Sequence, residues 1–370
     1  TRMLASFFCH DNAAPDADDN AAPPAARPER SPSLDSLSSW PDSGRDSGPT
    51  AAPAATVLTA HACGWDRPGR IDEIEARWST MEDLPLEVAS RDAGTPLSDE
   101  EEASIPKLKA AILERMGLDA PPQGFRSSHF TRWKLLFMLR ARDGDVEQAT
   151  LRALECMDAA DVALAHARAY ESAPASLKQL RNTYLPNGMF GQDKRGAPVM
   201  YGRMGLADVA GLVRETGMEF HRHQEFYANL VLWDTLYEQS KQRGVALLGG
   251  LFVFDLNGMT LSSGFANYRV LQQLVQDPVY PAGEHPLPEG MRKCLMCNAP
   301  WWIGKVWDAV KLLLPARTIE KVSIYRADEP DKFLAALLSR VDAEQVPDWL
   351  GGKAKGWPYH LGGTVPELHR

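Results

Sequence analysis

Residues 245–258 read Val-Ala-Leu-Leu-Gly-Gly-Leu-Phe-Val-Phe-Asp-Leu-Asn-Gly, an apolar run that ends in a polar turn. A continuous apolar run of this length predicts a strand over Val245–Phe254 that is buried on both faces. Further strand patterns lie at 197–201, 292–297 and 321–325, and they alternate with helical patterns at 262–275, 300–314 and 330–341. Because strands and helices alternate, we predict an α/β fold with a largely parallel sheet and right-handed crossovers.

The sequence before this region has the periodicity of helices. Ser98 and Glu101 form a capping box for a helix that reaches Met116, and Pro106 inside it predicts a kink or two separate pieces. Further helical patterns cover residues 71–81, 128–139, 146–169 and 218–242. We therefore expect residues 98–172 to form a small helical domain.

The N-terminal segment has a different composition from the rest of the chain. Ala, Pro, Ser and Asp fill 35 of its first 56 positions, and large apolar residues are few. Such a segment buries too little apolar surface to offset its chain entropy, so we expect it to be disordered. We extend this low-complexity segment to residues 1–95 and treat residues 354–370 as a C-terminal tail. The sequence starts at Thr1, which leaves its natural start and any targeting signal open.

Composition excludes several classes of protein. The formal net charge of −9 argues against a general nucleic-acid binder, which needs a basic face. The longest apolar run is far shorter than the roughly 18 residues of a membrane-spanning helix. GxGxxG, GxSxG and HExxH motifs are absent, so we expect no catalytic residues, no metal site and no cofactor. Five scattered cysteines indicate a reducing compartment, and Cys294 and Cys297 should face opposite sides of one strand.

An unusually apolar helix follows Pro300. Its only interruptions before Leu314 by charged residues are Lys305, Asp308 and Lys311, which lie on one arc. A helix of this kind is typical of a protein core, but three tryptophans within seven residues are more than packing usually requires. Tryptophan also favours ligand pockets and membrane interfaces, where one end of the ring is apolar and the other is wet. The pattern therefore fits a core helix, the wall of an apolar cavity, or a helix that enters a bilayer surface.

Four groups of residues, in order along the chain, resemble the motifs of the CRAL-TRIO family of lipid carriers. They are Leu135-Leu136 with Leu139–Arg142 and Asp145-Val146, Asp255–Gly258 with Ser262-Ser263, Pro288–Met291 with Cys297–Pro300, and Glu344–Pro347 with Gly351-Gly352. Each group alone is a weak signal, whereas all four in order at suitable spacing are a strong one. The resemblance covers roughly residues 98–353.

The resemblance implies a helical N-terminal module at 98–172 and a lipid-binding domain at 180–353, whose sheet floor and helical walls enclose one lipid. The helix after Pro300 would be the mobile gate of this pocket. Its candidate pocket and gate residues are Trp301, Trp302, Ile303, Val306, Trp307 and Val310. We expect residues 1–95 to be dispensable for lipid binding, because they lie outside the matched region.

Candidate headgroup residues also come from the resemblance. Lys311 matches the lysine that phosphatidylinositol-binding members use on the phosphate, but the acidic residue paired with it in those members is replaced here by Gln273. Arg140 and Arg142 match basic residues of the N-terminal motif, with structural ion pairing as an equal alternative. Ser240 aligns with a serine near the headgroup of phosphocholine-binding members.

The implied function is non-enzymatic transfer of one lipid, such as phosphatidylinositol, between membranes. The implied protein is a cytoplasmic monomer that touches membrane surfaces transiently, binds no nucleic acid and needs no cofactor besides the bound lipid. A second hypothesis is a sensor whose lipid occupancy regulates a partner protein, with the N-terminal segment as a docking site. An enzyme acting on lipids would need a nucleophile and base that the sequence does not offer.

Overall fold

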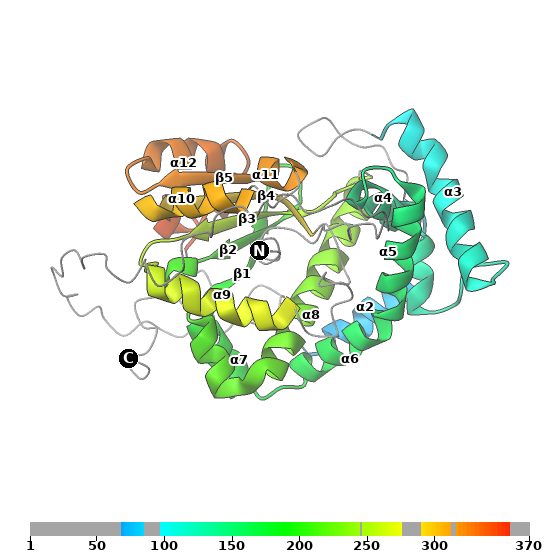
Figure 1. The fold of residues 1–370 in the computed structure, drawn as a ribbon, viewed down its shortest axis with the longest axis horizontal. Coiled ribbons are helices and arrows are strands. Elements are labelled where there is room, and N and C mark those ends of the chain that lie inside the picture. Colours follow the sequence, from blue (N-terminus) through cyan, green and yellow to red (C-terminus); the bar gives the residue numbers. More distant parts are fainter. Residues whose placement is uncertain (1–67, 85–96, 245, 276–289, 312–315, 356–370) are drawn as a thin grey trace, which may run out of the picture. The chain divides into compact units, whose positions relative to one another are not determined.

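The computed structural model describes residues 68–84, 97–244, 246–275, 290–311 and 316–355, all within one compact unit of the chain. Its centre is a five-stranded sheet in the order β1-β2-β3-β4-β5 (Figure 1). The strands are β1 (Asn187–Gln192), β2 (Pro198–Gly202), β3 (Gly250–Asp255), β4 (Met291–Ala299) and β5 (Val322–Arg326). β1 pairs with β2 antiparallel, and the other three pairings are parallel. The predicted α/β fold with a largely parallel sheet is confirmed.

The observed strands differ from the prediction at two places. β1 has no clear strand pattern in the sequence, because two glycines interrupt it; it forms by pairing with β2. β3 begins at Gly250, so the predicted strand over Val245–Phe254 was too long at its start. Gly249 has a φ of 87°, a left-handed conformation that an extended strand does not contain.

Helices surround the sheet and form the region before it. They are α2 (Arg70–Ser79), α3 (Asp99–Met116), α4 (Arg132–Ala141), α5 (Val146–Asp158), α6 (Ala160–Glu171), α7 (Ala175–Tyr184), α8 (Val209–Arg243), α9 (Leu261–Val275), α10 (Trp301–Val310), α11 (Ala316–Lys321) and α12 (Pro330–Leu338), with a 3-10 helix η3 (Phe125–Phe130) before α4. The capping box of Ser98 and Glu101 is present, and α3 continues through Pro106. α8 bends at Gly217, whose φ is 82°.

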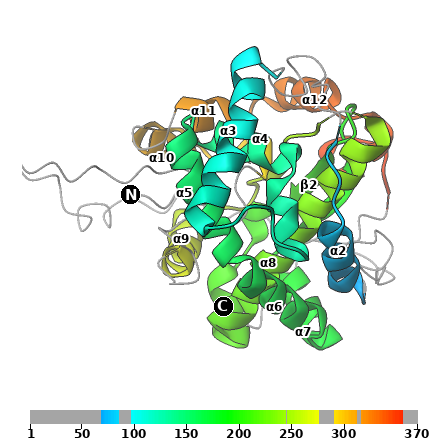
Figure 2. The same cartoon turned by 90° about the vertical axis from the view of Figure 1, so that its right-hand side faces the viewer.

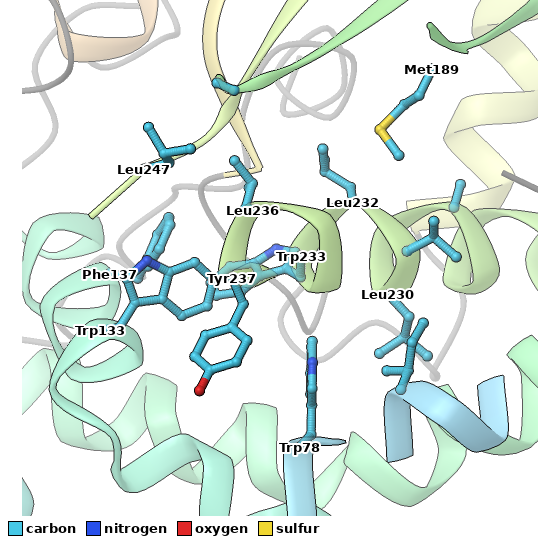
Figure 3. Close-up of a cluster of buried hydrophobic side chains, with 14 of the residues drawn as sticks. Trp78, Trp133, Phe137, Met189, Leu230, Leu232, Trp233, Leu236, Tyr237 and Leu247 are labelled. Carbon is cyan, nitrogen blue, oxygen red and sulfur yellow. The ribbon is translucent and has the colours of Figure 1, made fainter. Parts of the chain in front are cut away.

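Apolar side chains from the helices and from one face of the sheet form one large cluster, which we call the first core. It extends from α2–α6 through the middle of α8 to β2, β3 and β4. Figure 3 shows its centre, where Trp133, Phe137 and Trp233 lie together and Trp78 lies below them. The Trp133 and Trp233 ring centroids are 5.3 Å apart at an edge-on angle of 80°. The helical region and the sheet therefore share a continuous core.

α2 corrects the expectation that residues 1–95 are a disordered segment. The side chains of Ile71, Ile74 and Trp78 are fully buried, and α2 packs against η3, α6 and α8 (Figure 2). The helix predicted at 71–81 is thus part of the first core, since one apolar face of this short helix packs against three other elements. Residues 1–67 and 85–95 of the low-complexity segment, and the residues after Lys355, lie outside the described part of the structure.

Two buried charged groups hold α2 in place. The carboxylate of Asp234 on α8 is fully buried and pairs with Arg70 at 2.9 Å and with Arg77. Nearby, the amino group of Lys134 lies 3.6 Å from the centre of the Trp78 ring and donates to the Ser128 hydroxyl at 2.9 Å. Burial lowers the pKa of Lys134 well below its usual value. These polar contacts make the position of α2 specific.

Candidate functional site

The two faces of the sheet are covered to different extents. Alternate side chains of β3 and β4 point to opposite faces, so Leu251, Val253 and Leu295 belong to the first core. Phe254 and Met296 belong to a second apolar cluster, here called the second cluster, and the half-buried Phe252 packs against both clusters. Cys294 and Cys297 are buried, form no disulfide bond and lie on opposite faces of the sheet, as predicted. The two faces therefore differ in what covers them.

Apolar side chains of the second cluster are only partly shielded from solvent. The half-buried members include Met200, Phe252, Met259, Met291, Ile303, Trp307, Val322 and Ile324. They come from the sheet, from α10 and from the loop after β3. By contrast, Val199, Leu251, Val253 and Leu295 on the other face are fully buried. An apolar surface left half-covered between a sheet and two helices is suited to an apolar ligand.

α9 and α10 cover this second face of the sheet. Val270 of α9 is buried in the second cluster, and Ile303 and Trp307 of α10 pack against it. The two helices also lie close to each other, since a β-carbon at Gly264 would stand 3.5 Å from the Trp302 ring. A contact of that length is an ordinary van der Waals distance, so the half-buried Trp302 ring lies against α9 at this position.

The outer faces of α9 and α10 expose large apolar side chains. Leu261 and Phe265 are one helical turn apart on α9 and are 41% and 44% exposed, and Trp301 on α10 is 59% exposed. A basic residue follows one turn after the aromatic ring on each helix, namely Arg269 and Lys305. The Lys305 amino group lies 5.2 Å from the centre of the Trp301 ring. Both helices therefore combine an exposed aromatic ring with a nearby cation.

The entry points of these helices are joined by a hydrogen bond between two motif residues. Asp255, at the end of β3, accepts 2.8 and 2.9 Å hydrogen bonds from the Asn298 side-chain amide and the Asn257 main-chain N–H. Asn298 has a φ of 52°, where the chain turns out of β4 towards α10.

Burial and the nearby Asp255 carboxylate raise the pKa of the Cys297 thiol, so this thiol stays protonated and unreactive.

The predicted headgroup residues on α9 and α10 are accessible. Gln273 is exposed on α9. Lys311 directly follows α10, is half-exposed, and pairs with Asp308 at 2.6 Å. Of the predicted gate residues, Trp302, Ile303, Val306 and Trp307 are half-buried, and Trp301 is exposed. The Val310 side chain and residues 312–315 lie outside the described part of the structure.

The other three predicted headgroup residues have partners on the side of the first core. Arg140 makes a bidentate ion pair with Glu101, through 2.7 and 2.9 Å contacts. Burial would raise the pKa of the Glu101 carboxyl, but hydrogen bonds from Arg140 and Ser98 outweigh burial and lower it. Arg142 donates to the Ala141 carbonyl. The buried Ser240 hydroxyl donates to the Leu236 carbonyl and accepts from the Leu247 N–H, so it joins the end of α8 to the lead into β3.

Sequence reasoning missed most of the second face. The alternation of Phe252 with Val253 and of Met296 with Cys297 could have located this face. However, the sequence of a strand that is apolar on both faces does not show which face is more deeply buried. Among the described residues, no group of three or more His, Cys, Asp or Glu side chains is arranged to hold a metal ion. No described helix has the length and hydropathy to cross a membrane.

Comparison with known proteins places this site in a recognised domain. Residues 182–352 match the CRAL/TRIO domain. The chain is 26% identical over 172 residues to an Arabidopsis thaliana protein named "Phosphatidylinositol/phosphatidylcholine transfer protein SFH4", covering 46% of this chain and 27% of the relative. It is 24% identical over 179 residues to "Sec14 cytosolic factor" of Schizosaccharomyces pombe, covering 48% of this chain and 59% of the relative. The matches thus span about a quarter to three fifths of these relatives.

A solved structure, titled "Crystal structure of Sfh5", is a more distant match. Its sequence identity is 14% and its TM-score 0.42, over 62% of this chain and 81% of that one. That similarity is too low to support an argument about the fold, which therefore rests on the elements and pairings described above.

Proposed function

We propose that this chain, which belongs to the CRAL-TRIO lipid-binding family through residues 182–352, binds one membrane lipid against the second face of its sheet and carries it between membranes. The observation that carries the proposal is the half-buried apolar surface of the second cluster beneath α9 and α10. Moving an acyl chain through water is unfavourable by about 0.8 kcal/mol per CH₂ group. A carrier must therefore offer a dry apolar surface of this kind.

The role of α10 as a gate is supported by the two directions in which its apolar side chains face. Ile303 and Trp307 pack on the second cluster, whereas Trp301 faces outward. A helix that has apolar residues on both sides can cover a bound lipid when closed and meet a bilayer when open. The adjacent α9, with Leu261 and Phe265 exposed, would form the other half of the docking surface.

The partner surface for α9 and α10 is proposed to be an anionic bilayer. Trp301 and Phe265 would lie at the level of the headgroups, where aromatic rings are favoured. Arg269 and Lys305, one turn further along each helix, would meet lipid phosphates, and such juxtamembrane cations contribute roughly 1 kcal/mol each. The chain would act without catalysis, as a cytoplasmic monomer that contacts membranes transiently.

The headgroup is proposed to be that of a phospholipid, with phosphatidylinositol as the first candidate. Support comes from the cation Lys311 at the end of α10 and from the name of the Arabidopsis thaliana relative, which describes phosphatidylinositol transfer. Gln273 can donate hydrogen bonds to and accept them from inositol hydroxyls, although it lacks the charge of the acid in phosphatidylinositol-binding members.

Two measurements test this function. Native mass spectrometry of the purified chain should show one bound phospholipid per protein. A vesicle assay should show transfer of labelled phosphatidylinositol that depends on protein concentration. A chain that retains no lipid from any vesicle, while melting cooperatively, would overturn the proposal. A chain that binds lipid but gives no net transfer would exclude the carrier role and leave only lipid binding.

A further inference from the structure

The second cluster is unusually rich in methionine. Six of the 12 methionines of the chain lie in it or pack against it, as far as the structure describes the chain: Met200, Met204, Met218, Met259, Met291 and Met296. They come from strands β2 and β4, from the 3-10 helix Met204–Leu206, from the turn after β3, and from α8. The methionines of the second cluster therefore come from several elements rather than from one.

Neighbouring positions on the same strands show that this choice follows the face of the sheet. On β2, Val199 and Tyr201 face the first core, while Met200, between them, packs against the second cluster as well. On β4, Leu295 faces the first core and Met296 the second cluster. Strand propensity favours branched and aromatic residues at all of these positions, so it does not explain the methionines.

Methionine gives the wall of a pocket properties that branched residues lack. Its side chain is unbranched, has three rotatable bonds and fills irregular gaps, whereas a β-branched residue is stiff at χ1. Its sulfur is polarisable and makes favourable contacts with aromatic rings. Since Met200, Met259 and Met291 are only half-buried, their rotamers are not fully fixed by the surrounding protein.

We propose that the methionines of the second cluster make the lipid site permissive towards the tails of its ligand, so that polyunsaturated phospholipids bind about as well as saturated ones. This inference rests on the proposed lipid-binding function and adds the tail class to it. Each cis double bond bends an acyl chain. A wall of flexible methionine side chains can re-pack around both bent and straight chains.

Exchange with mixed vesicles tests the proposal on the full chain. The vesicles hold phosphatidylcholine and phosphatidylinositol, each with disaturated and with tetra-unsaturated tails in equal amounts. After the protein is separated from the vesicles, mass spectrometry measures the ratio of the two tail classes within each bound headgroup class. For the wild type this ratio should lie within about threefold of one. A ratio beyond about tenfold in either direction would overturn the inference.

Variants assign the effect to the methionines. The triple variant Met200→Leu, Met291→Leu, Met296→Leu conserves volume and should shift the ratio at least about threefold towards saturated tails. Met138→Leu with Met157→Leu is the matched control, because both residues are buried in the first core, and it should leave the ratio unchanged. If the triple variant is poorly folded, the single change Met200→Leu gives the same test. An unchanged ratio in a folded Met-to-Leu variant would overturn the role of methionine.

A failure of the proposed function would give a different result from a failure of this inference. If the wild type binds neither headgroup class with either tail, the amount of bound lipid is zero, and both the proposed function and this inference fall. If lipid is bound, its amount supports the proposed function while the tail ratio alone decides the inference.

Discussion

The side-chain amide of Asn298 donates a 2.8 Å hydrogen bond to the carboxylate of Asp255, and this bond joins the carboxyl ends of β3 and β4. The same carboxylate oxygen accepts the Asn257 main-chain N–H at 2.9 Å. Asp255 precedes the loop into α9, and Asn298 precedes α10. One buried carboxylate therefore orients the exits towards both helices that cover the second face.

We expect Asp255→Ala to lower the free energy of unfolding by about 1–3 kcal/mol, because two donors lose their acceptor. Asn298→Gly should have a smaller effect of about 0.5–1.5 kcal/mol, since glycine adopts the positive φ without strain and Asp255 keeps the Asn257 N–H as a donor. Urea unfolding of both variants measures this order. A stability of Asp255→Ala equal to that of the wild type would show that the bond does not organise the exits.

Removal of α2 should destabilise the whole fold. Trp78→Ala opens a cavity in the first core and should lower the free energy of unfolding by about 3–5 kcal/mol. A chain that starts at Leu97 should be less stable still, because the buried carboxylate of Asp234 then loses both arginines. A chain that starts at Pro68 is the matched control and should unfold like the full chain. Equal unfolding midpoints for the two truncated chains would contradict the role of α2.

Trp301 and Trp302 should respond differently to the same substitution. Trp301→Glu changes a side chain that is 59% exposed, so it should leave the melting temperature unchanged and reduce co-sedimentation with anionic vesicles. Trp302→Glu places a charge beside Gly264 between the two helices and should also lower the melting temperature. If Trp301→Glu binds vesicles as the wild type does, α10 does not dock through this residue.

Binding of an anionic lipid at Lys311 should compete with Asp308. Lys311→Ala should weaken binding of phosphatidylinositol more than that of phosphatidylcholine, because a charge-assisted hydrogen bond to phosphate contributes roughly 1.5–3 kcal/mol. Asp308→Asn should strengthen phosphatidylinositol binding, since it removes the carboxylate 2.6 Å from the lysine. Competition between the two lipids, measured for each variant, checks whether phosphatidylinositol binding weakens in Lys311→Ala and strengthens in Asp308→Asn. Equal losses for both lipids on Lys311→Ala would show a structural role only.

Stability should fall as the pH is lowered from 6.5 towards 4. Burial and the nearby Arg181 lower the pKa of His221 from 6.5 to about 4, so between these values the unfolded chain binds a proton that the folded chain does not. This contribution is fully favourable above pH 6.5 and is lost towards pH 4, by at most roughly 3 kcal/mol. His221→Phe should flatten the dependence, as measured by urea unfolding across this pH range. An identical slope in the variant would mean that other groups, such as the buried His129, determine it.

Local pattern was sufficient to predict most elements of the fold. The capping box of Ser98 and Glu101 starts α3 because both hydrogen bonds are made within four residues. Gly244 ends α8 for a similarly local reason, with a φ of 65°. β1 could not be predicted, because it is held by contacts with distant segments, namely its pairing with β2 and the hydrogen bond from the Gln192 N–H to the Gln345 side chain. The buried pairs of Asp234 with Arg70 and Arg77 could not be predicted either, since they join residues far apart in the chain.

The candidate site was predicted in part. The tryptophan-rich helix was recognisable because three large rings in seven residues are unusual in any environment. Which of them is exposed was not, since Trp301 and Trp302 are adjacent and their exposure depends on how α10 packs beside α9, where Trp302 lies near Gly264. The methionines of the second cluster are scattered from Met200 to Met296 and become one surface only when the sheet is assembled.

By itself, the sequence determined the alternation of strands and helices, the caps and turns, and the order of the four motif groups, because all of these depend on periodicity and short-range hydrogen bonds. Tertiary structure alone decided that α2 belongs to the core, that Asp255 meets Asn298, and that one face of the sheet is left half-covered. These features depend on contacts between segments far apart in the chain, and the burial of a side chain is a property of everything packed around it.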